Sequence, residues 1–517
     1  MTYPIPAFIV AVCIGIALHD ILQRKRAILR NFPIVGHLRY LLESIGPELR
    51  QYIVAGNSEE RPFSRGQRRW VYASSKQQNN YFAFGSENDQ EASPNYTIIK
   101  HAAFPLNSPH VGEATYDPTY AIACEKVLGE YSGRRKAFRP ASVINISGMS
   151  FGALSGAAVE ALNRGAARAQ CLQNTGEGGL SPHHLHGGDL TYQIGTGYFG
   201  CREENGQFSL TRLMELVDAN SSVRAIEIKL SQGAKPGAGG VLPKAKLTAE
   251  IAGIRGVPLD KDCVSPSRHT AFSDADSLLD FVESIAAATG LPVGIKSAVG
   301  QLDFWHDLAR LCETTGRQVD FVTIDGGEGG TGAAPLVFAD RVGLPFKLGF
   351  SQVQRVFAER GLHDRMVFIG SGKLGFPDTA LVGFALGADL INVGREALLS
   401  AGCIQALKCH TNRCPAGITT QSRWLSRGLD PQLKSERVAN YIITLRKELL
   451  ALARAAGVPH PAQVSARHIE IVNDHFGTQT LAEVLGGRGR GVAVGQEAPA
   501  FARQSVVVSR PLAFKRP

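Results

Sequence analysis

The chain has 517 residues, of which 44% are hydrophobic and 20% are charged, and it carries a formal net charge of +9. This composition excludes a disordered protein, a coiled coil and a collagen-like fibre, and nine cysteines in this length exclude a small disulfide scaffold. The positive charge lies at the ends, because residues 1–80 hold 11 Lys and Arg against five acidic residues, and residues 486–517 hold six against one. The nearly neutral body between them argues against nucleic acid as a partner.

The first 30 residues contain an uncharged apolar run, IPAFIVAVCIGIAL at 5–18, and four cations follow it at positions 24, 25, 26 and 30. With its apolar neighbours the run approaches the roughly 20 residues of a transmembrane helix. The absence of a preceding basic residue and of an Ala-x-Ala site disfavours a cleaved signal peptide. We therefore predict a single-pass anchor over 1–30 in the cell membrane, with the catalytic part in the cytoplasm. A buried helix in an entirely cytoplasmic protein is the alternative.

Residues 31–140 are polar and mixed, with one helical pattern, HLRYLLESIGPELRQYI, and a later stretch rich in Gln, Asn, Ser and Pro. We interpret this segment as an N-terminal extension that caps a larger core. No repeat of 20–50 residues is present, which disfavours solenoids and propellers. Residues 476–517 are expected to form a basic C-terminal tail.

Between residues 141 and 475 short β-branched runs alternate with amphipathic helical stretches, such as 276–289, 303–315 and 376–386. This alternation predicts a parallel sheet covered by helices, closed as a (β/α)8 TIM barrel, although only seven strands can be placed. A doubly wound open sheet is the alternative, and it is disfavoured because no G-x-G-x-x-G follows the first strand. The seven predicted strands are Ser142–Ser147, Cys171–Asn174, Val223–Leu230, Pro292–Ser297, Phe321–Asp325, Met366–Gly370 and Leu390–Val393.

Glycine-rich loops follow five of these strands, at 148–152, 175–179, 326–332, 371–373 and 394–395. In a barrel such loops share the rim that carries the active site, and the last two occupy the usual phosphate position. Backbone N–H groups that glycine leaves accessible bind an anion there, and Lys373 or Arg395 can add charge. The pattern therefore predicts a phosphorylated cofactor, with tight turns alone as the alternative.

Lysines accompany two further strands. Lys296 lies at the end of the 292–297 strand, where it can stabilise negative charge on a flavin ring or an enolate; a structural ion pair is the alternative. Gln232 and Lys235 follow the 223–230 strand, and Lys235 lies on a loop from which it can reach an anionic substrate.

Three of the nine cysteines gather in GCIQALKCHTNRCPAG, as Cys403, Cys409 and Cys414. Three thiolates within twelve residues, with a proline after the last, resemble the ligands of an iron–sulfur cluster. A zinc ion held by these cysteines and His410 is the alternative, but His410 directly follows Cys409, which is a poor spacing for one ion. The lack of an obvious fourth ligand favours a three-iron cluster.

Segments in order from about 142 to 421 resemble the central, FMN-binding portion of the glutamate synthase large subunit. The QGAKPG run and the cysteine spacing are the most specific of these segments. The apolar N-terminus and KRAILRNFPIVGHLRY are similar to those of stand-alone FMN-binding glutamate synthase family proteins of bacteria. The matching segments are ISGMSFGALS (146–155), NTGEGG (174–179), IKLSQGAKPG (228–237), DGGEGGTGA (325–333), the loops at 370–375 and 393–395, and CIQALKCHTNRCPAGITTQ (403–421).

The resemblance implies an oxidoreductase with FMN and a [3Fe-4S] cluster that reduces 2-iminoglutarate, formed from 2-oxoglutarate and ammonia, to glutamate. Because no nicotinamide-binding motif is present, electrons are expected from an external donor, a ferredoxin, an NADPH-oxidising flavoprotein or a membrane donor. The resemblance also assigns roles to individual residues. It implies Met149, Ser150, Asn174 and Lys296 at the flavin ring, Gly327, Gly370, Gly372, Gly394 and Arg395 at its phosphate, and Glu177, Gln232 and Lys235 at the substrate.

The chain departs from the family pattern in two ways that bear on the reaction. The nucleophilic first cysteine of a glutaminase half is missing, so we expect no release of ammonia from glutamine. The family's G-E-G-G-Q-L-P is replaced by 237–243, in which Ala238 and Val241 stand for Glu and Gln. A different 2-oxo acid or amine therefore remains an alternative, as does a membrane-anchored flavin and iron–sulfur module that only transfers electrons.

Overall fold

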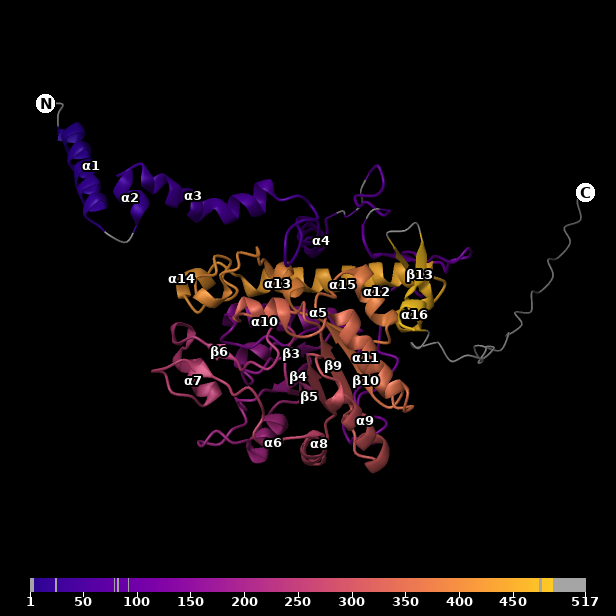
Figure 1. The fold of residues 1–517 in the computed structure, drawn as a ribbon. Coiled ribbons are helices and arrows are strands. Elements are labelled where there is room, and N and C mark those ends of the chain that lie inside the picture. The colour runs from indigo at the N-terminus through magenta and orange to yellow at the C-terminus, as the bar shows by residue number, and fades with distance from the viewer. Residues whose placement is uncertain are drawn as a thin grey trace, which may run out of the picture.

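Eight parallel strands form a closed barrel in the order β10-β11-β2-β3-β4-β5-β8-β9, and helices surround it (Figure 1). This confirms the predicted (β/α)8 TIM barrel. The computed structural model describes residues 4–23, 26–78, 80, 83–91, 93–473 and 477–486. The barrel strands are β2 (Ile144–Ile146), β3 (Gln173–Asn174), β4 (Leu190–Ile194), β5 (Val223–Lys229), β8 (Val293–Ser297), β9 (Phe321–Asp325), β10 (Val367–Ser371) and β11 (Leu390–Val393).

The strand that the sequence pattern does not reveal is β4, which lies between β3 and β5. It was missed for two physical reasons. All its residues are buried, but two of them, Thr191 and Gln193, are polar, so the strand does not read as an apolar run. Gln193 is tolerated there because it donates to a carboxylate inside the barrel. In addition, only a short 3₁₀ turn, Pro182–His184, separates β3 from β4, so the usual alternation of strand and helix is interrupted.

Helices follow most of the other strands, and the three predicted from periodicity are present. The helix α8 begins with a capping box between Asp274 and Ser277, and α9 and α12 match the predicted stretches closely. The helices around the barrel are α5 (Gly156–Ala169), α6 (Leu210–Ala219), α7 (Ala249–Arg255), α8 (Ala275–Thr289), α9 (Asp303–Thr315), α10 (Leu336–Arg341), α11 (Phe346–Ala358), α12 (Pro377–Ala385) and α13 (Arg395–Ala401).

A 25-residue helix, α15 (Pro431–Ala455), packs across α5, α12 and α13 on one side of the barrel (Figure 1). The helices α5 and α15 approach closely because Gly165 has no side chain: a Cβ there would lie 2.7 Å from Cβ of Val438. Arg446 is fully buried and donates to the carbonyl oxygens of Ala169 at 2.9 Å and Thr119 at 2.7 Å. These contacts fix α15 against the barrel.

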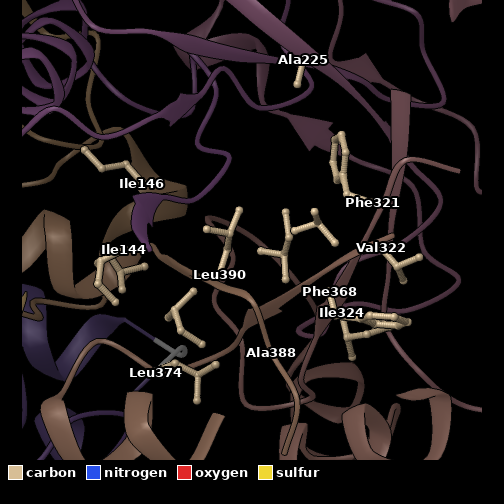
Figure 2. Packing of buried hydrophobic residues seen from close by; sticks show 14 of the residues in the cluster. Ile144, Ile146, Ala225, Phe321, Val322, Ile324, Phe368, Leu374, Ala388 and Leu390 are labelled. Carbon is tan, nitrogen blue, oxygen red and sulfur yellow. The ribbon is translucent and has the colours of Figure 1, made fainter. Parts of the chain in front are cut away.

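Apolar side chains from the barrel strands and the surrounding segments form one buried hydrophobic core. Figure 2 shows this packing, with Ile144 and Ile146 from β2, Phe321 from β9 and Leu390 from β11 among the labelled residues. All five residues of β8 and of β9 are buried. Burial on both faces explains why these strands begin with apolar residues, and the charged Lys296 and Asp325 come near their C-terminal ends.

The N-terminal segment forms α1 (Pro4–Leu22), α2 (Ala27–Asn31) and α3 (Gly36–Leu49), which lie apart from the barrel (Figure 1). Among the residues that the structure describes, no helix combines the length and the hydropathy needed to cross a membrane. The predicted membrane-spanning anchor is therefore not supported. The N-terminal segment continues into α4 (Arg65–Ser75), which packs on α13 and α15.

The remaining elements link distant parts of the sequence. A small antiparallel sheet pairs β1 (Tyr96–Ile99) with β12 (Ile469–Val472), and β12 with β13 (Thr478–Thr480). The other short elements are β6 (Val241–Leu242), β7 (Cys263–Val264), α14 (Arg423–Ser426) and α16 (Leu481–Val484). Most of the predicted basic tail, 487–517, lies outside the described residues, and the predicted domain limits stay predictions.

Candidate functional site

The C-terminal ends of the barrel strands bring the predicted cofactor and substrate residues to one rim. Because all eight strands are parallel, the loops that follow them leave the barrel at the same end. The strand register places Lys229 beside Lys296 and Ser371 beside Asp325. Loops that are far apart in the sequence therefore surround one opening.

The glycine loops after β9 and β10 lie against each other. Gly372 has φ +118°, a conformation that glycine adopts without strain, and a Cβ there would lie 3.0 Å from the amide nitrogen of Gly326. Gly326 donates to the carbonyl of Ser371 at 2.9 Å, and Gly327 donates to that of Leu344 at 2.8 Å. Gly370 belongs to β10 itself. The glycines therefore allow two backbones to meet where the sequence predicts a phosphate.

Two cations lie at the same place on the rim. The guanidinium carbon of Arg395 is 4.9 Å from the centroid of the Phe63 ring, and Nζ of Lys373 is 5.4 Å from it. Arg395, which follows Gly394, also donates to the carbonyl of Glu328. Burial lowers the pKa of both cations, and for Lys373 the charge of Arg395 lowers it further. Neither forms a salt bridge within the described part of the chain, so both are available to an anion.

Lys296 forms the ion pair that was the alternative interpretation of this residue. Its Nζ lies 3.6 Å from Oδ2 of Asp325, and both side chains are buried. The same carboxylate oxygen accepts a hydrogen bond from the amide of Gly233 at 2.9 Å. Lys296 therefore stands at the rim with a carboxylate partner, and its role at a flavin ring stays a prediction.

A small pocket gathers the three predicted substrate residues. Lys229 bridges two of them, because its Nζ lies 3.0 Å from Oε1 of Glu177 and donates to Oε1 of Gln232 at 2.7 Å. Nζ of Lys235 is 3.5 Å from the carbonyl of Gly239. Glu177, Lys229, Gln232, Lys235 and Gly239 all line this pocket. Two ammonium groups thus surround one carboxylate.

The charges in this pocket shift one another's pKa values. Burial favours the neutral form of Glu177, but the charges of Lys229 and Lys235 outweigh burial and lower the pKa of this carboxyl. Burial lowers the pKa of Lys235, although Glu177 opposes this shift. Lys235 forms no salt bridge within 4.0 Å of any described residue, which leaves its ammonium group available to an anionic ligand.

A buried arginine that the sequence does not single out joins this pocket to the loop after β2. Arg255 ends α7 and donates to the carbonyl of Phe151 at 3.0 Å and to Oγ of Ser150 at 3.4 Å. Its Nε is buried without a hydrogen-bond partner in the described residues. Its charge also lowers the pKa of Glu177. The guanidinium therefore connects the predicted flavin and substrate residues.

Three of the four residues predicted at the flavin ring, all except Lys296, lie where the loop after β2 touches the end of β3 and its loop. A Cβ on Gly176 would lie 2.5 Å from the amide nitrogen of Ser150 and 2.8 Å from the carbonyl carbon of Met149. Oδ1 of Asn174 accepts a hydrogen bond from the amide of Gly176 at 2.9 Å. The structure thus brings Met149, Ser150 and Asn174 together, next to Glu177.

The three clustered cysteines lie in an irregular segment between α13 and α14, with a 3₁₀ turn at Cys409–Thr411. In the portion of the chain that the structure describes, no group of three or more His, Cys, Asp or Glu is arranged to hold a metal ion. Neither the predicted iron–sulfur cluster nor its zinc alternative is therefore shown. Cys414 is buried, and Cys403 and Cys409 are half-buried.

Polar groups nevertheless surround these sulfur atoms. Burial raises the pKa of the Cys403 thiol to about 12. Burial also acts to raise the pKa of Cys414, but the nearby polar groups of Thr419, Ile418 and Ala416 outweigh it and lower this pKa. Nζ of Lys246 lies 3.4 Å from the carbonyl of Cys409. N–H groups directed at sulfur are a recurring feature of thiolate ligands.

Comparison with known proteins adds to this geometry. Residues 122–459 match the family described as "Conserved region in glutamate synthase". The chain is 39% identical over 484 residues to the glutamate synthase large subunit-like protein YerD of Bacillus subtilis (strain 168), which covers 88% of this chain and 91% of that protein.

The chain belongs to the glutamate synthase family. As a member of this family it is an enzyme of the oxidoreductase class, and the matched region contains every predicted site residue from Met149 to Cys414. It is also 36% identical over 322 residues to the archaeal glutamate synthase [NADPH] of Methanocaldococcus jannaschii, of which it spans 59%.

Among solved structures, a mandelate oxidase mutant with a monooxide FMN adduct is similar, with a TM-score of 0.40 and 14% identity, over 74% of this chain and 88% of that one. A TM-score this low does not establish a shared function.

Proposed function

We propose that this member of the glutamate synthase family is an FMN- and iron–sulfur-dependent oxidoreductase that reduces 2-iminoglutarate, formed from 2-oxoglutarate and ammonia, to glutamate. An external donor, a ferredoxin or an NADPH-oxidising flavoprotein, supplies the electrons. The observation that carries this proposal is the pocket in which Lys235 forms no salt bridge with any described carboxylate, beside the Lys229–Glu177 ion pair. A pocket with an uncompensated ammonium group suits a carboxylate-bearing oxo acid.

The rim has the features that FMN requires. The glycine loops lie close together at the rim, where we propose that Gly327, Gly370, Gly372 and Gly394 surround the phosphate. Arg395 and Lys373, which lack carboxylate partners among the described residues, provide charge for that phosphate. Met149, Ser150, Asn174 and Lys296 are proposed to surround the ring. When bound, FMN supplies hydride transfer to the imine carbon.

Residues of this chain then bind and orient the substrate. Lys235 binds a carboxylate of the oxo acid through a charge-assisted hydrogen bond. Lys229 keeps Glu177 ionised, so that Glu177 can accept a hydrogen bond from the nitrogen of the imine. Gln232 holds Lys229 in place through its Oε1 and is itself fixed by donating to the carbonyl of Gly330 at 3.1 Å.

Cys403, Cys409 and Cys414 are the residues that we propose hold a [3Fe-4S] cluster. Their spacing supports this assignment, as does the amide of Gln405, which donates to Sγ of Cys403 at 3.4 Å. Such a cluster would relay electrons from the external donor.

A specific observation supports an alternative substrate. Ala238 lines the pocket, and Val241 of the same loop is 48% exposed. These apolar side chains occupy the positions of the family's Glu and Gln, which favours a 2-oxo acid with a less polar side chain, or an amine larger than ammonia.

A turnover assay tests the proposed function. The full chain is purified anaerobically and analysed for FMN and iron, and glutamate formation is then measured with reduced methyl viologen, 2-oxoglutarate and ammonium. Formation of glutamate that depends on all three supports the proposal. Turnover only with other 2-oxo acids or with methylamine would support the competing substrate. Bound zinc in place of iron would refute the proposed [3Fe-4S] cluster.

A further inference from the structure

A glutamate inside the barrel stands directly beneath the predicted flavin residues. Glu227 lies on β5, two residues before Lys229, and is almost completely buried. Its Oε1 accepts hydrogen bonds from Nδ2 of Asn174 at 2.8 Å and from Nε2 of Gln193 at 2.6 Å. Its Oε2 accepts one from Oγ1 of Thr323 at 2.7 Å. Three strands, β3, β4 and β9, thus each direct a donor at this carboxylate.

The cations of the rim do not neutralise this group. Lys229 pairs with Glu177, and Lys296 pairs with Asp325. Within the described residues, Glu227 forms no salt bridge. It shares the lining of a small internal chamber with Asn174 and with the apolar Phe321. All three hydrogen bonds to Glu227 are donated by neutral groups, which is compatible with an ionised carboxylate.

The hydrogen bonds also determine which way two amide groups face. Because Glu227 accepts through Oε1 from both amide nitrogens, the oxygen atoms of Asn174 and Gln193 face away from this carboxylate. Oδ1 of Asn174 accepts from the amide of Gly176 and so shapes the loop that carries Glu177. A Cβ on Gly148 would lie 2.7 Å from this Oδ1 and 2.9 Å from Nε2 of Gln193, so the loop of the predicted flavin residues rests on these amides.

We propose that Glu227 is a positioning residue whose negative charge is paired with no described cation: it fixes the side chains of Asn174 and Gln193, and through them the loop of Gly148 and Met149 that would contact FMN, and its charge lowers the reduction potential of that FMN. This inference rests on the proposed function, because it assumes that FMN binds at the rim. A fixed negative charge in a low-dielectric interior opposes the addition of electrons nearby.

Two substitutions separate the charge of Glu227 from its reach. Glu227→Gln removes the charge but keeps the hydrogen bonds, because the new amide nitrogen can donate to the hydroxyl of Thr323. Glu227→Asp keeps the charge but is one methylene shorter, so it cannot reach all three donors. Thr323→Val serves as the matched control, since it removes one hydrogen bond and leaves the charge.

The FMN midpoint potential and FMN affinity are measured for the full-length wild type and the three variants. For Glu227→Gln we expect wild-type affinity, and a reduced-to-oxidised ratio at fixed ambient potential that rises roughly tenfold, which is about 30 mV for a two-electron couple. For Glu227→Asp we expect weaker FMN binding with a nearly unchanged potential, and for Thr323→Val an unchanged potential.

The possible failures are distinct. An unchanged potential in flavin-loaded Glu227→Gln overturns the charge proposal and leaves the proposed function standing. If Glu227→Gln does not fold, Glu227→Asp with wild-type FMN affinity still overturns the positioning role. A wild-type protein that binds no FMN overturns both the proposed function and this inference.

Discussion

Replacement of Lys235 by methionine is expected to weaken substrate binding without changing the fold. Lys235 is 8% exposed, and its Nζ has one distant polar neighbour, the carbonyl of Gly239 at 3.5 Å. Methionine retains most of the aliphatic stem, so the variant removes mainly the charge. The neighbouring Lys229 cannot substitute for it, because its ammonium is already shared between Glu177 and Gln232.

The size of the effect follows from this environment. A hydrogen bond to a charged group contributes about 1.5–3 kcal/mol. We place Lys235 in the upper part of that range because the nearby Glu177 carboxylate forms its salt bridge with Lys229. A loss of about 2–3 kcal/mol corresponds to a roughly 30- to 150-fold higher KM for the oxo acid. Burial lowers the pKa of Lys235, so this lysine loses its proton at a lower pH than an ordinary lysine. The wild-type KM for the oxo acid should therefore begin to rise at that lower pH as the pH is increased.

The assay is steady-state reduction of the oxo acid with ammonium at saturation, with the exposed Lys244→Met from the same segment as the control. We expect an unchanged KM for the control. An unchanged KM for Lys235→Met would refute the reasoning, and a fall in kcat at constant KM would assign Lys235 to the chemical step.

Three further predictions concern the core, the cysteines and pH. Gly165→Ala should destabilise the protein by about 1–3 kcal/mol, because the added Cβ would collide with Val438. The control Gly253→Ala should raise the unfolding temperature slightly, because a Cβ at this position in α7 meets open space. Equal shifts in unfolding temperature for the two variants would contradict the close packing of α5 on α15. Cys414→Ser should abolish bound iron and its EPR signal while FMN stays bound. The control Cys312→Ser, which changes a buried cysteine outside the 403–414 cluster, should leave the iron content unchanged. Burial lowers the pKa of His269 to about 4 and that of His184 to about 3. The folded state therefore binds fewer protons than the unfolded state between about pH 4 and 6.5, and stability falls as the pH is lowered through this window, by about 2 kcal/mol per histidine between pH 7 and 5. Urea unfolding of His269→Gln should lose correspondingly less stability over that interval, and an identical loss would show that His269 is not responsible.

The barrel could be predicted because its strands are short, apolar runs that are buried on both faces, separated by helices with the expected period. The eighth strand could not be found, because Gln193 faces a buried carboxylate and no helix precedes β4. The membrane anchor was predicted from the length of an uncharged run and the cations that follow it, and no described helix meets the requirement for a span.

The site was predictable where chemistry is local in the sequence. Gln232 and Lys235 share one loop, and the structure places them in one pocket with Glu177. Lys229 was missed although its position at a strand end, three residues before Gln232, was a usable signal. Arg255 and Glu227 carry no such signal, because the partners of Glu227 lie 34 to 96 residues away in sequence and the Phe151 carbonyl that Arg255 binds lies 104 residues away.

Single-turnover oxidation of the reduced protein tests the central claim most directly. Anaerobically reduced full-length protein is mixed in a stopped-flow instrument with 2-oxoglutarate and ammonium, and flavin absorbance is followed while glutamate is quantified. We predict rapid recovery of oxidised flavin that requires both reagents and yields one glutamate for each flavin reoxidised. A colourless protein, or a flavin whose reoxidation is indifferent to every 2-oxo acid and amine, would contradict it.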